Sequence, residues 1–156
     1  MNSLVRTVLR IASLLALIGV LPAHALEVIG VADGDTITVL DRGKPVKVRL
    51  ANIDAPERHQ PFGERAKLSL SQLCYRQDAR VDVTGTDRYG RRIARVSCAG
   101  IDANRAQVER GLAWVYVKYN QDPRLAALQD GARKERRGIW SEPGPVPPWE
   151  FRKARH

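Results

Sequence analysis

Alternating apolar and polar residues predict three β-strands in the first part of the folded chain, at residues 27–31, 36–40 and 46–50. Successive side chains of a strand point to opposite faces, so each segment offers one apolar face to a core. In the third segment, Val48 lies on that face while Arg49 points to the opposite, polar side. Clusters of turn-forming residues separate the three segments, which favours short connections between them.

The hydrophobic period then lengthens to that of a helix. Apolar residues three to four positions apart predict a helix over 63–74, and alternation returns in 80–84 and 92–98, which we predict to form a hairpin. Two more helices are expected, a short one over 102–110 that begins at a capping aspartate and a last one over 125–138 that ends at a glycine. These elements predict an α+β fold, with a five-stranded β-barrel of the OB type as first choice and about three packed α-helices.

The N-terminal residues have the order of a secretory leader. Two arginines precede an apolar run at 11–21, and a small-x-small sequence follows it and ends at Ala25. The run is shorter than the roughly 20 apolar residues that span a bilayer as a helix. We predict cleavage after Ala25 and export to the periplasm or the medium, without stable membrane insertion of the mature chain. A buried N-terminal helix is the alternative.

The length of 156 residues suits one compact domain besides the leader. We assign 1–25 to the leader, 26–142 to the folded domain and 143–156 to a basic, proline-rich tail. In this tail the segment 143–148 is expected to be extended, and two aromatic residues after it, Trp149 and Phe151, are candidates for anchoring it to the domain.

Composition indicates a polyanionic partner and an oxidising compartment. The chain has 26 Lys+Arg against 17 Asp+Glu, a formal charge of +9, and 20 of the basic residues are arginines, which suit bidentate phosphate binding. Composition bias would also explain the arginine excess. The two cysteines, Cys74 and Cys98, are too few for a zinc site, and export favours a disulfide between them. Two buried free thiols remain the alternative.

Three carboxylates are candidates for one cation site. Asp35 begins a predicted strand, while Asp54 and Glu57 follow the neighbouring strand, and a hairpin brings these two ends together. Each carboxylate alone has an ordinary explanation in an Asx turn or a helix-entry loop. Together they would repel one another, and a hard cation with oxygen ligands, calcium rather than zinc, would relieve that repulsion.

Two arginines extend this candidate site toward a phosphate. Arg49 leaves the polar face of its strand toward the same end of the barrel, and Arg91 follows the hairpin turn. A cation and two guanidinium groups would neutralise a phosphodiester and its developing charge, while a carboxylate orients or deprotonates water. A solvated charge on an edge strand is the plainer explanation of Arg91 alone.

At these residues the sequence resembles the staphylococcal nuclease family over about residues 28–140. The resemblance is carried by Val-Ala-Asp-Gly-Asp-Thr at 31–36, Val-Arg-Leu at 48–50 leading to Ile-Asp-Ala-Pro-Glu at 53–57, and Asp-Arg-Tyr-Gly-Arg at 87–91. It implies an OB-fold barrel with helices. It also implies calcium-dependent hydrolysis of DNA and RNA with low sequence preference, at the 5′ phosphorus–oxygen bond, which leaves 3′-phosphate ends.

The resemblance also implies roles for single residues. It makes Asp35 and Asp54 the side-chain calcium ligands, with the backbone carbonyl of Ala55 as a further ligand where the family has a threonine. The lost hydroxyl alters the surroundings of that carbonyl. Glu57 matches the residue that acts as general base or positions the attacking water.

The same resemblance assigns the phosphate contacts. Arg49 and Arg91 match the two arginines that bind the phosphate and stabilise the transition state, while Arg88 and Tyr89 match positions that contact a terminal phosphate of the bound nucleotide.

The sequence leaves alternatives for the role of three aromatic residues and for the function of the protein. Three rings after the second helix can either stack on bases or pack between helix and barrel, namely Trp114, Tyr116 and Tyr119. The predicted function is a monomeric endonuclease acting on single-stranded or locally open DNA and RNA. A non-catalytic module of the same fold that binds nucleic acid or protein is the alternative, and a protein associated with anionic envelope surfaces rests on charge alone.

Overall fold

A computed structural model describes residues 25–120 and 122–154 of the chain. The predicted leader lies outside these residues except for its last residue, Ala25. Within the described part, no helix has the length and apolar character needed to cross a membrane.

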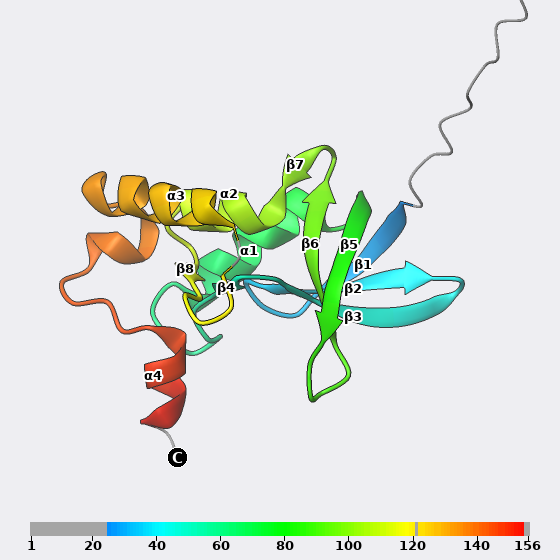
Figure 1. Ribbon diagram of the computed structural model, residues 1–156, viewed down its shortest axis with the longest axis horizontal. Helices are drawn as coiled ribbons and strands as arrows, with labels where there is room; N and C mark the ends of the chain where they lie inside the picture. The colour runs from blue at the N-terminus through cyan, green and yellow to red at the C-terminus, as the bar shows by residue number, and fades with distance from the viewer. Residues whose placement is uncertain (1–24, 121, 155–156) are drawn as a thin grey trace, which may run out of the picture.

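Five strands close into a barrel, as the sequence predicts (Figure 1). Their order is β3-β2-β1-β5-β6, and a parallel pairing of β3 with β6 joins the two edges. The other pairings in the barrel are antiparallel, and the β2–β3 register sets Thr36 opposite Arg49. The strands are β1 (Leu26–Val31), β2 (Thr36–Asp41), β3 (Lys44–Leu50), β5 (Asp78–Thr86) and β6 (Arg92–Cys98).

Three two-residue strands were not predicted. The strand β7 (Ile101–Asp102) pairs with β6, and β4 (Ile53–Asp54) pairs with β8 (Trp114–Val115) in a separate small sheet. Two prolines, Pro56 and Pro61, predict an irregular loop over residues 52–61, and residues 53–54 fall within it. Because β8 pairs with it, this short stretch holds Asp54 opposite Trp114.

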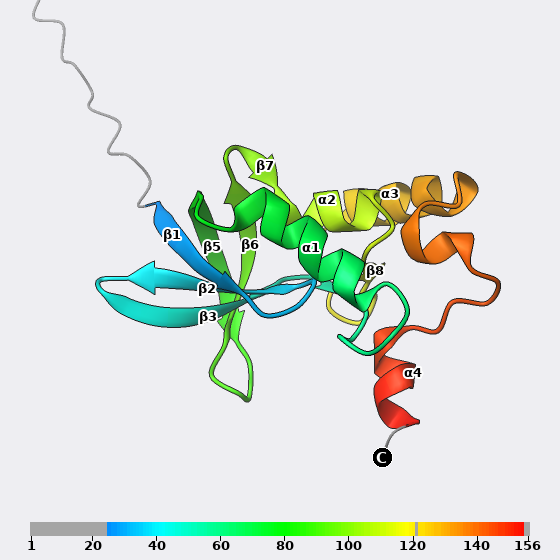
Figure 2. The same cartoon turned by 180° about the vertical axis from the view of Figure 1, so that it is seen from behind.

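Three helices gather on one side of the barrel, whereas α4 stands apart at the C-terminal end (Figures 1 and 2). The helix α1 spans Gly63–Cys74 as predicted, and Asp102 caps α2 by accepting a hydrogen bond from the Arg105 backbone N–H. The helical elements are α1 (Gly63–Cys74), α2 (Ala103–Glu109), α3 (Pro123–Lys134), the 3-10 helix η1 (Gly138–Ser141) and α4 (Pro148–Lys153).

Two expectations for the C-terminal part are wrong. The helix α3 ends at Lys134 rather than Gly138, because Arg136 adopts a positive φ of 53° that turns the chain out of the helix. Gly138 instead starts η1, where a Cβ would meet the Gly111 carbonyl oxygen at 2.1 Å. The proline-rich tail is also not extended throughout, because Pro148 stands at the first position of α4, where its fixed φ favours a helix.

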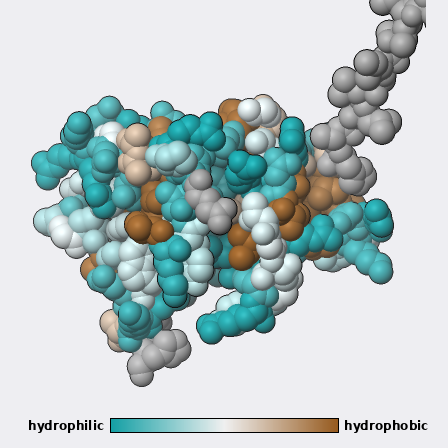
Figure 3. Space-filling view, in the orientation of Figure 1, coloured by the Kyte–Doolittle hydropathy of each residue, from teal (hydrophilic) through white to brown (hydrophobic). Residues whose placement is uncertain are grey.

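The apolar core fills the barrel and continues beneath the helices. Inward-facing residues of the strands, such as Val28, Ile37 and Val48, pack with Leu70 of α1 and Leu125 of α3, all with almost no exposed surface. The outer face in Figure 3 is mainly hydrophilic, with separate small apolar areas. The core therefore fixes the helices against the barrel while most charged side chains lie at the surface.

The predicted disulfide is present. It links Cys74 at the end of α1 to Cys98 at the end of β6, and both side chains are buried. The alternative of two free thiols is therefore wrong for the described residues, which contain no unpaired cysteine. The bridge ties the first helix directly to the barrel.

Reducing this disulfide is expected to lower the free energy of unfolding by about 3 kcal/mol, because a closed loop of some 24 residues gains conformational entropy in the unfolded chain. Urea unfolding with and without dithiothreitol measures the change. The Cys74→Ala/Cys98→Ala double variant is the control, because its midpoint should not respond to reductant. A midpoint of the unaltered protein that also ignores reductant would contradict the prediction.

Candidate active site

The turn between β1 and β2 presents Asp35 to the end of the barrel. The Asp33 carboxylate accepts a hydrogen bond from the Asp35 backbone N–H at 3.0 Å, which forms an Asx turn. The Asp35 carboxylate in turn accepts bonds from the Thr36 hydroxyl at 2.9 Å and from the Ala55 backbone N–H at 2.9 Å. The second contact joins this turn to the loop after β4, so Asp35 and Asp54 lie close together.

Buried packing fixes the position of this turn. The Gln107 side chain, which is fully buried on α2, donates to the Gly34 carbonyl at 2.7 Å and to the Ala66 carbonyl of α1 at 2.9 Å. A Cβ at Gly34 would lie 2.6 Å from the Ala66 Cβ and 2.7 Å from the Ala55 Cβ. The turn between Asp33 and Asp35 therefore has room only for glycine at position 34.

Arg49 joins the two aspartates through one nitrogen. Its Nη2 lies 2.7 Å from an Asp54 oxygen and 3.4 Å from an Asp35 oxygen. The Asp54 side chain is 2% exposed, so this contact is shielded from water and stronger than an ion pair on the surface. The prediction that Arg49 and both aspartates meet at one end of the barrel is confirmed.

The acidic cluster remains electrostatically strained. Burial raises the pKa of Asp33 to about 6, and repulsion from Asp35 adds to the shift. Burial also raises the pKa of Asp54, with repulsion from Asp35 adding to it, although the contacts of Asp54 with Arg152 and Arg49 act in the opposite direction. Crowded, buried carboxylates with raised pKa values favour any cation that enters among them.

The hairpin between β5 and β6 orients Arg91 toward this cluster. Asp87 accepts hydrogen bonds from the backbone N–H groups of Tyr89 and Arg91 and, at 2.7 Å, from the Arg91 Nε. The Arg91 Nη1 lies 3.5 Å from the hydroxyl of Thr36, which donates to Asp35. The slight burial of Asp87 would raise its pKa, but these bonds lower it overall, so Asp87 holds Arg91 as a carboxylate.

Arg88 and Tyr89 lie at the exposed tip of the same hairpin. The Arg88 guanidinium stacks over the Tyr89 ring at 4.8 Å from its centroid, and Tyr89 is 68% exposed. Arg91 lies 5.6 Å from the same centroid, so the tip adjoins the candidate site through Arg91. No hydrogen bond in the described part of the chain joins either residue to the acidic cluster.

Sequence reasoning missed Arg152. This residue of α4 reaches an Asp54 oxygen with Nη2 at 2.8 Å and a Glu57 oxygen with Nη1 at 2.6 Å. Arg152 therefore links Glu57 to Asp54. The sequence predicts that Glu57 lies near Asp54, but it does not predict this arginine as the link. The Pro-Pro-Trp start of α4 signals an element, but nothing in the local pattern tells where its arginine points.

The three candidate stacking rings have different surroundings. Trp114 is 5% exposed and packs edge-on against Trp140 with ring centroids 5.3 Å apart, so the packing explanation applies to it. Tyr116 stacks on Trp149 of α4 with centroids 5.4 Å apart and planes 14° from parallel. Tyr119 lies edge-on to Tyr116 and is 56% exposed.

The donor set of this site fits a hard cation, although guanidinium groups now occupy it. No three His, Cys, Asp or Glu side chains of the described residues form a group ready to hold a metal. Asp35 and Asp54 nevertheless supply carboxylate oxygens around one shared point, which is the ligand type that calcium prefers. The Arg49 Nη2 lies between these two oxygens, and the Arg152 Nη2 contacts the other oxygen of Asp54.

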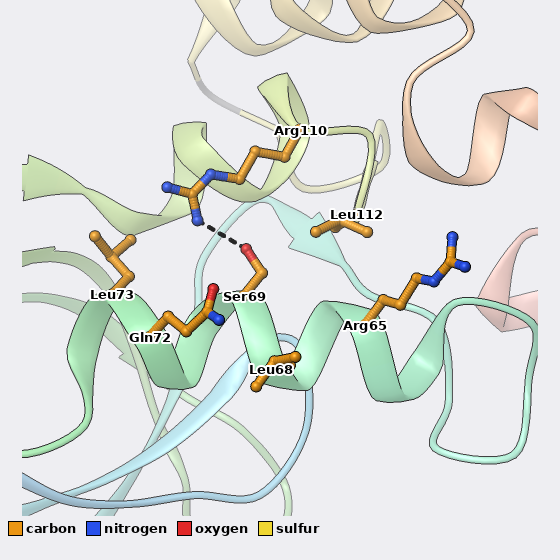
Figure 4. A pocket seen from close by; sticks show the side chains of 7 residues that line it. All are labelled: Arg65, Leu68, Ser69, Gln72, Leu73, Arg110 and Leu112. Atoms are coloured by element: carbon orange, nitrogen blue, oxygen red, sulfur yellow. Dashed lines mark hydrogen bonds between the residues drawn. The ribbon is translucent and has the colours of Figure 1, made fainter.

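A separate depression lies between α1 and α2 (Figure 4). Its volume is about 470 Å³, and the Arg110 Nη1 donates to the Ser69 hydroxyl across it at 2.8 Å. None of the candidate catalytic residues lines it. The lining residues are Arg65, Leu68, Ser69, Gln72, Leu73, Arg110 and Leu112.

Comparison with known proteins places this barrel and its site in one class. The family model described as "Staphylococcal nuclease homologue" matches residues 47–142, which include the end of β3 with Arg49, the loop after β4 and the β5–β6 hairpin. The chain therefore belongs to the staphylococcal nuclease family.

Relatives agree with this assignment. A protein of Escherichia coli O157:H7 named "Uncharacterized endonuclease" is 44% identical over 127 residues, covering 81% of this chain and 83% of its own. A "Micrococcal nuclease" of Shigella flexneri is 37% identical over 168 aligned residues, covering 99% of this chain and 97% of its own. An "Uncharacterized endonuclease" of Haemophilus influenzae is 39% identical over 149 residues, covering 92% and 84%. These matches support a nuclease, that is, a phosphodiesterase, as the class of protein.

Replacing Gly34 with alanine is expected to destabilise the protein by about 1–3 kcal/mol, because the added methyl overpacks the contact with Ala66 and Ala55. The shift of Asp35 should also lower nuclease activity per folded molecule. Gly85→Ala is the matched control, since nothing lies within 4 Å of its added Cβ. Thermal unfolding and a single-stranded DNA assay measure both effects, and equal stability and activity of the two variants would contradict the prediction.

Proposed function

We propose that the protein is an exported, calcium-dependent endonuclease that hydrolyses DNA and RNA with low sequence preference and leaves 3′-phosphate ends. The observation that supports this most is the gathering of Asp35, Asp54 and Glu57 at one end of the barrel, together with Arg49. Arg91 approaches the same group through Thr36. Membership of a nuclease family makes a phosphodiester the substrate for this arrangement.

The substrate would be held chiefly through its phosphates. Arg49 approaches the carboxylates from β3 and Arg91 from the turn before β6, so a phosphate between them would contact two guanidinium groups. Arg88 and Tyr89 at the hairpin tip would contact a neighbouring phosphate. The +9 charge of the whole chain draws polyanions without regard to base sequence, which accords with low sequence preference.

Calcium is the cation that we propose for the acidic cluster. Asp35 and Asp54 would hold it through carboxylate oxygens, and the backbone carbonyl of Ala55 would add a ligand from the loop after β4. When bound, calcium would supply positive charge that polarises the phosphoryl group. Asp33 would remain behind the ligands and hold the Asp35 backbone through its Asx turn.

Glu57 and the arginines would carry out the reaction. Glu57 would accept a proton from a water molecule as its oxygen adds to phosphorus and the bond to the 5′ oxygen breaks. Arg49 and Arg91 would stabilise the charge that develops on the phosphoryl oxygens. The departing 5′ oxygen takes up a proton, and the phosphate stays on the 3′ side.

Export is supported indirectly. The buried Cys74–Cys98 bridge suits an oxidising compartment, in agreement with the leader predicted at 1–25. A binding module without catalysis remains the second candidate, and tight oligonucleotide binding with no cleavage under any divalent cation would favour it. The gathering of charged side chains speaks against a module that only binds, because such a module has no need of Glu57 beside Asp54. The side chains are Asp35, Arg49, Asp54 and Glu57.

Calcium removal is expected to abolish cleavage. The purified mature protein should degrade single-stranded DNA and RNA in millimolar calcium and lose this activity in EGTA, because the carboxylates then have no cation to offer the phosphate. Restored calcium should restore cleavage. The products should carry 5′-hydroxyl ends that polynucleotide kinase labels without prior phosphatase treatment, and 3′-phosphate ends that a polymerase extends only after the phosphate is removed. Equal activity in calcium and in EGTA would contradict the metal-dependent mechanism.

Replacement of Arg91 by alanine is expected to lower kcat by about 10²- to 10³-fold, because the developing phosphoryl charge loses a fixed donor. Arg95→Ala is the matched control, since Arg95 lies on β6, the strand that follows Arg91, but is exposed. Turnover of both variants on the same DNA, with unfolding temperatures to check folding, measures the effect. Similar turnover of the two variants would remove Arg91 from the catalytic set.

A further inference from the structure

The C-terminal helix α4 is attached to the candidate site at several points. The buried Gln60 side chain donates to the Val146 carbonyl at 2.5 Å, and its Oε1 accepts from the Glu57 backbone N–H at 3.1 Å. Pro148 at the start of α4 is buried, and Trp149 stacks on Tyr116. The segment before α4 is therefore joined directly to the loop that carries Glu57.

Arg152 fills the space between the two carboxylates that calcium and water would use. Its two terminal nitrogens contact Asp54 at 2.8 Å and Glu57 at 2.6 Å, and a third contact to Asp54 measures 3.4 Å. Because Arg49 holds the other side of Asp54 at 2.7 Å, both oxygens of that carboxylate are already engaged by guanidinium groups.

The attachment of α4 rests on few side chains, of which Pro148 is buried and Arg152 is partly exposed. The helix has six residues, too few to persist on its own without packing against the rest of the protein. The Arg152 side chain is 42% exposed, whereas that of Asp54 is 2% exposed. The connecting segment contains Gly144 with a positive φ of 64° and several prolines, and its packing against the described domain is confined to a few residues.

We propose that α4 is an occluding helix whose Arg152 acts as an internal cation and competes with a divalent cation for Asp54 and Glu57. The proposal rests on the proposed calcium-dependent function and adds a regulatory contact to the same site. In the closed form, α4 satisfies the buried carboxylates. When calcium takes Asp54, Arg152 must leave, and Trp149 is then released from Tyr116.

Calcium binding tests the competition without using activity as the readout. In isothermal titration calorimetry, Arg152→Gln is expected to bind calcium about tenfold more tightly than the unaltered protein, the gain expected if about one molecule in ten is open before the change. Lys153→Gln is the matched control, because it removes a neighbouring positive charge that is exposed and outside the site. It should bind calcium like the unaltered protein.

A second variant and a second signal guard against misfolding. Trp149→Ala keeps Arg152 and the carboxylates in the sequence but removes the ring that packs on Tyr116. Because α4 then loses one of its attachments, this variant is also expected to bind calcium more tightly. In the unaltered protein, calcium should change tryptophan fluorescence, and the Trp149→Phe variant should lose most of that change. Circular dichroism confirms that each variant is folded.

The outcomes separate the two proposals. If all folded variants bind calcium with the affinity of the unaltered protein, the occluding role of α4 is wrong while calcium binding stands. If Arg152→Gln raises KM for DNA at unchanged calcium affinity, Arg152 binds substrate instead and the competition is also overturned. If neither the unaltered protein nor Arg152→Gln binds calcium, the proposed metal-dependent function fails and the inference fails with it.

Discussion

The repulsion among buried carboxylates is the constraint on which the rest of the site depends. Asp33, Asp35 and Asp54 lie close together with little access to water, and burial raises the pKa of Asp33 and of Asp54. Such a cluster is costly unless positive charge and hydrogen-bond donors surround it. The chain provides both, in the Arg49 guanidinium and in the Ala55 backbone N–H. The repulsion that remains would favour the entry of a cation, as our proposal requires.

The barrel supplies the fixed positions that such a cluster needs. Closure by the parallel β3–β6 pairing brings the strand that carries Arg49 next to the strand that follows Arg91. The β2–β3 register sets Thr36 opposite Arg49, and Thr36 lies between Asp35 and Arg91 in the hydrogen-bond network. The small β4–β8 sheet then fixes Asp54 from the other side. Backbone pairing thus places the segments that carry the charged groups, and side-chain contacts such as that of Asp87 with Arg91 orient them.

The sequence predicts those parts of the molecule that local pattern determines. Period-two alternation located the five barrel strands, and helical spacing located α1 to the residue. The two-residue strands could not be predicted, because a pairing so short leaves no periodic pattern in the sequence. The end of α3 could not be predicted either, because it depends on the positive φ of Arg136, which a residue other than glycine rarely adopts. Likewise, Asp35 and Asp54 were found because a hairpin sets their distance, whereas Arg152 is 98 residues from Asp54 and only tertiary packing brings it there.

The position of Arg152 follows from the same electrostatic constraint. A protein whose carboxylates are arranged for a divalent cation must remain folded when that cation is absent, and an unpaired buried carboxylate such as Asp54 would then be strongly destabilising. The guanidinium of Arg152, on a short and partly exposed helix, pairs with the cluster. In our proposal it would be replaceable, because the helix is otherwise held by Trp149 and by the contact of Gln60 with its leading segment. A covalent or deeply buried counter-charge would stabilise the fold equally well but would leave no access to the metal ligands. In our proposal, the limited attachment of α4 would allow one cluster to serve both folding and cation binding.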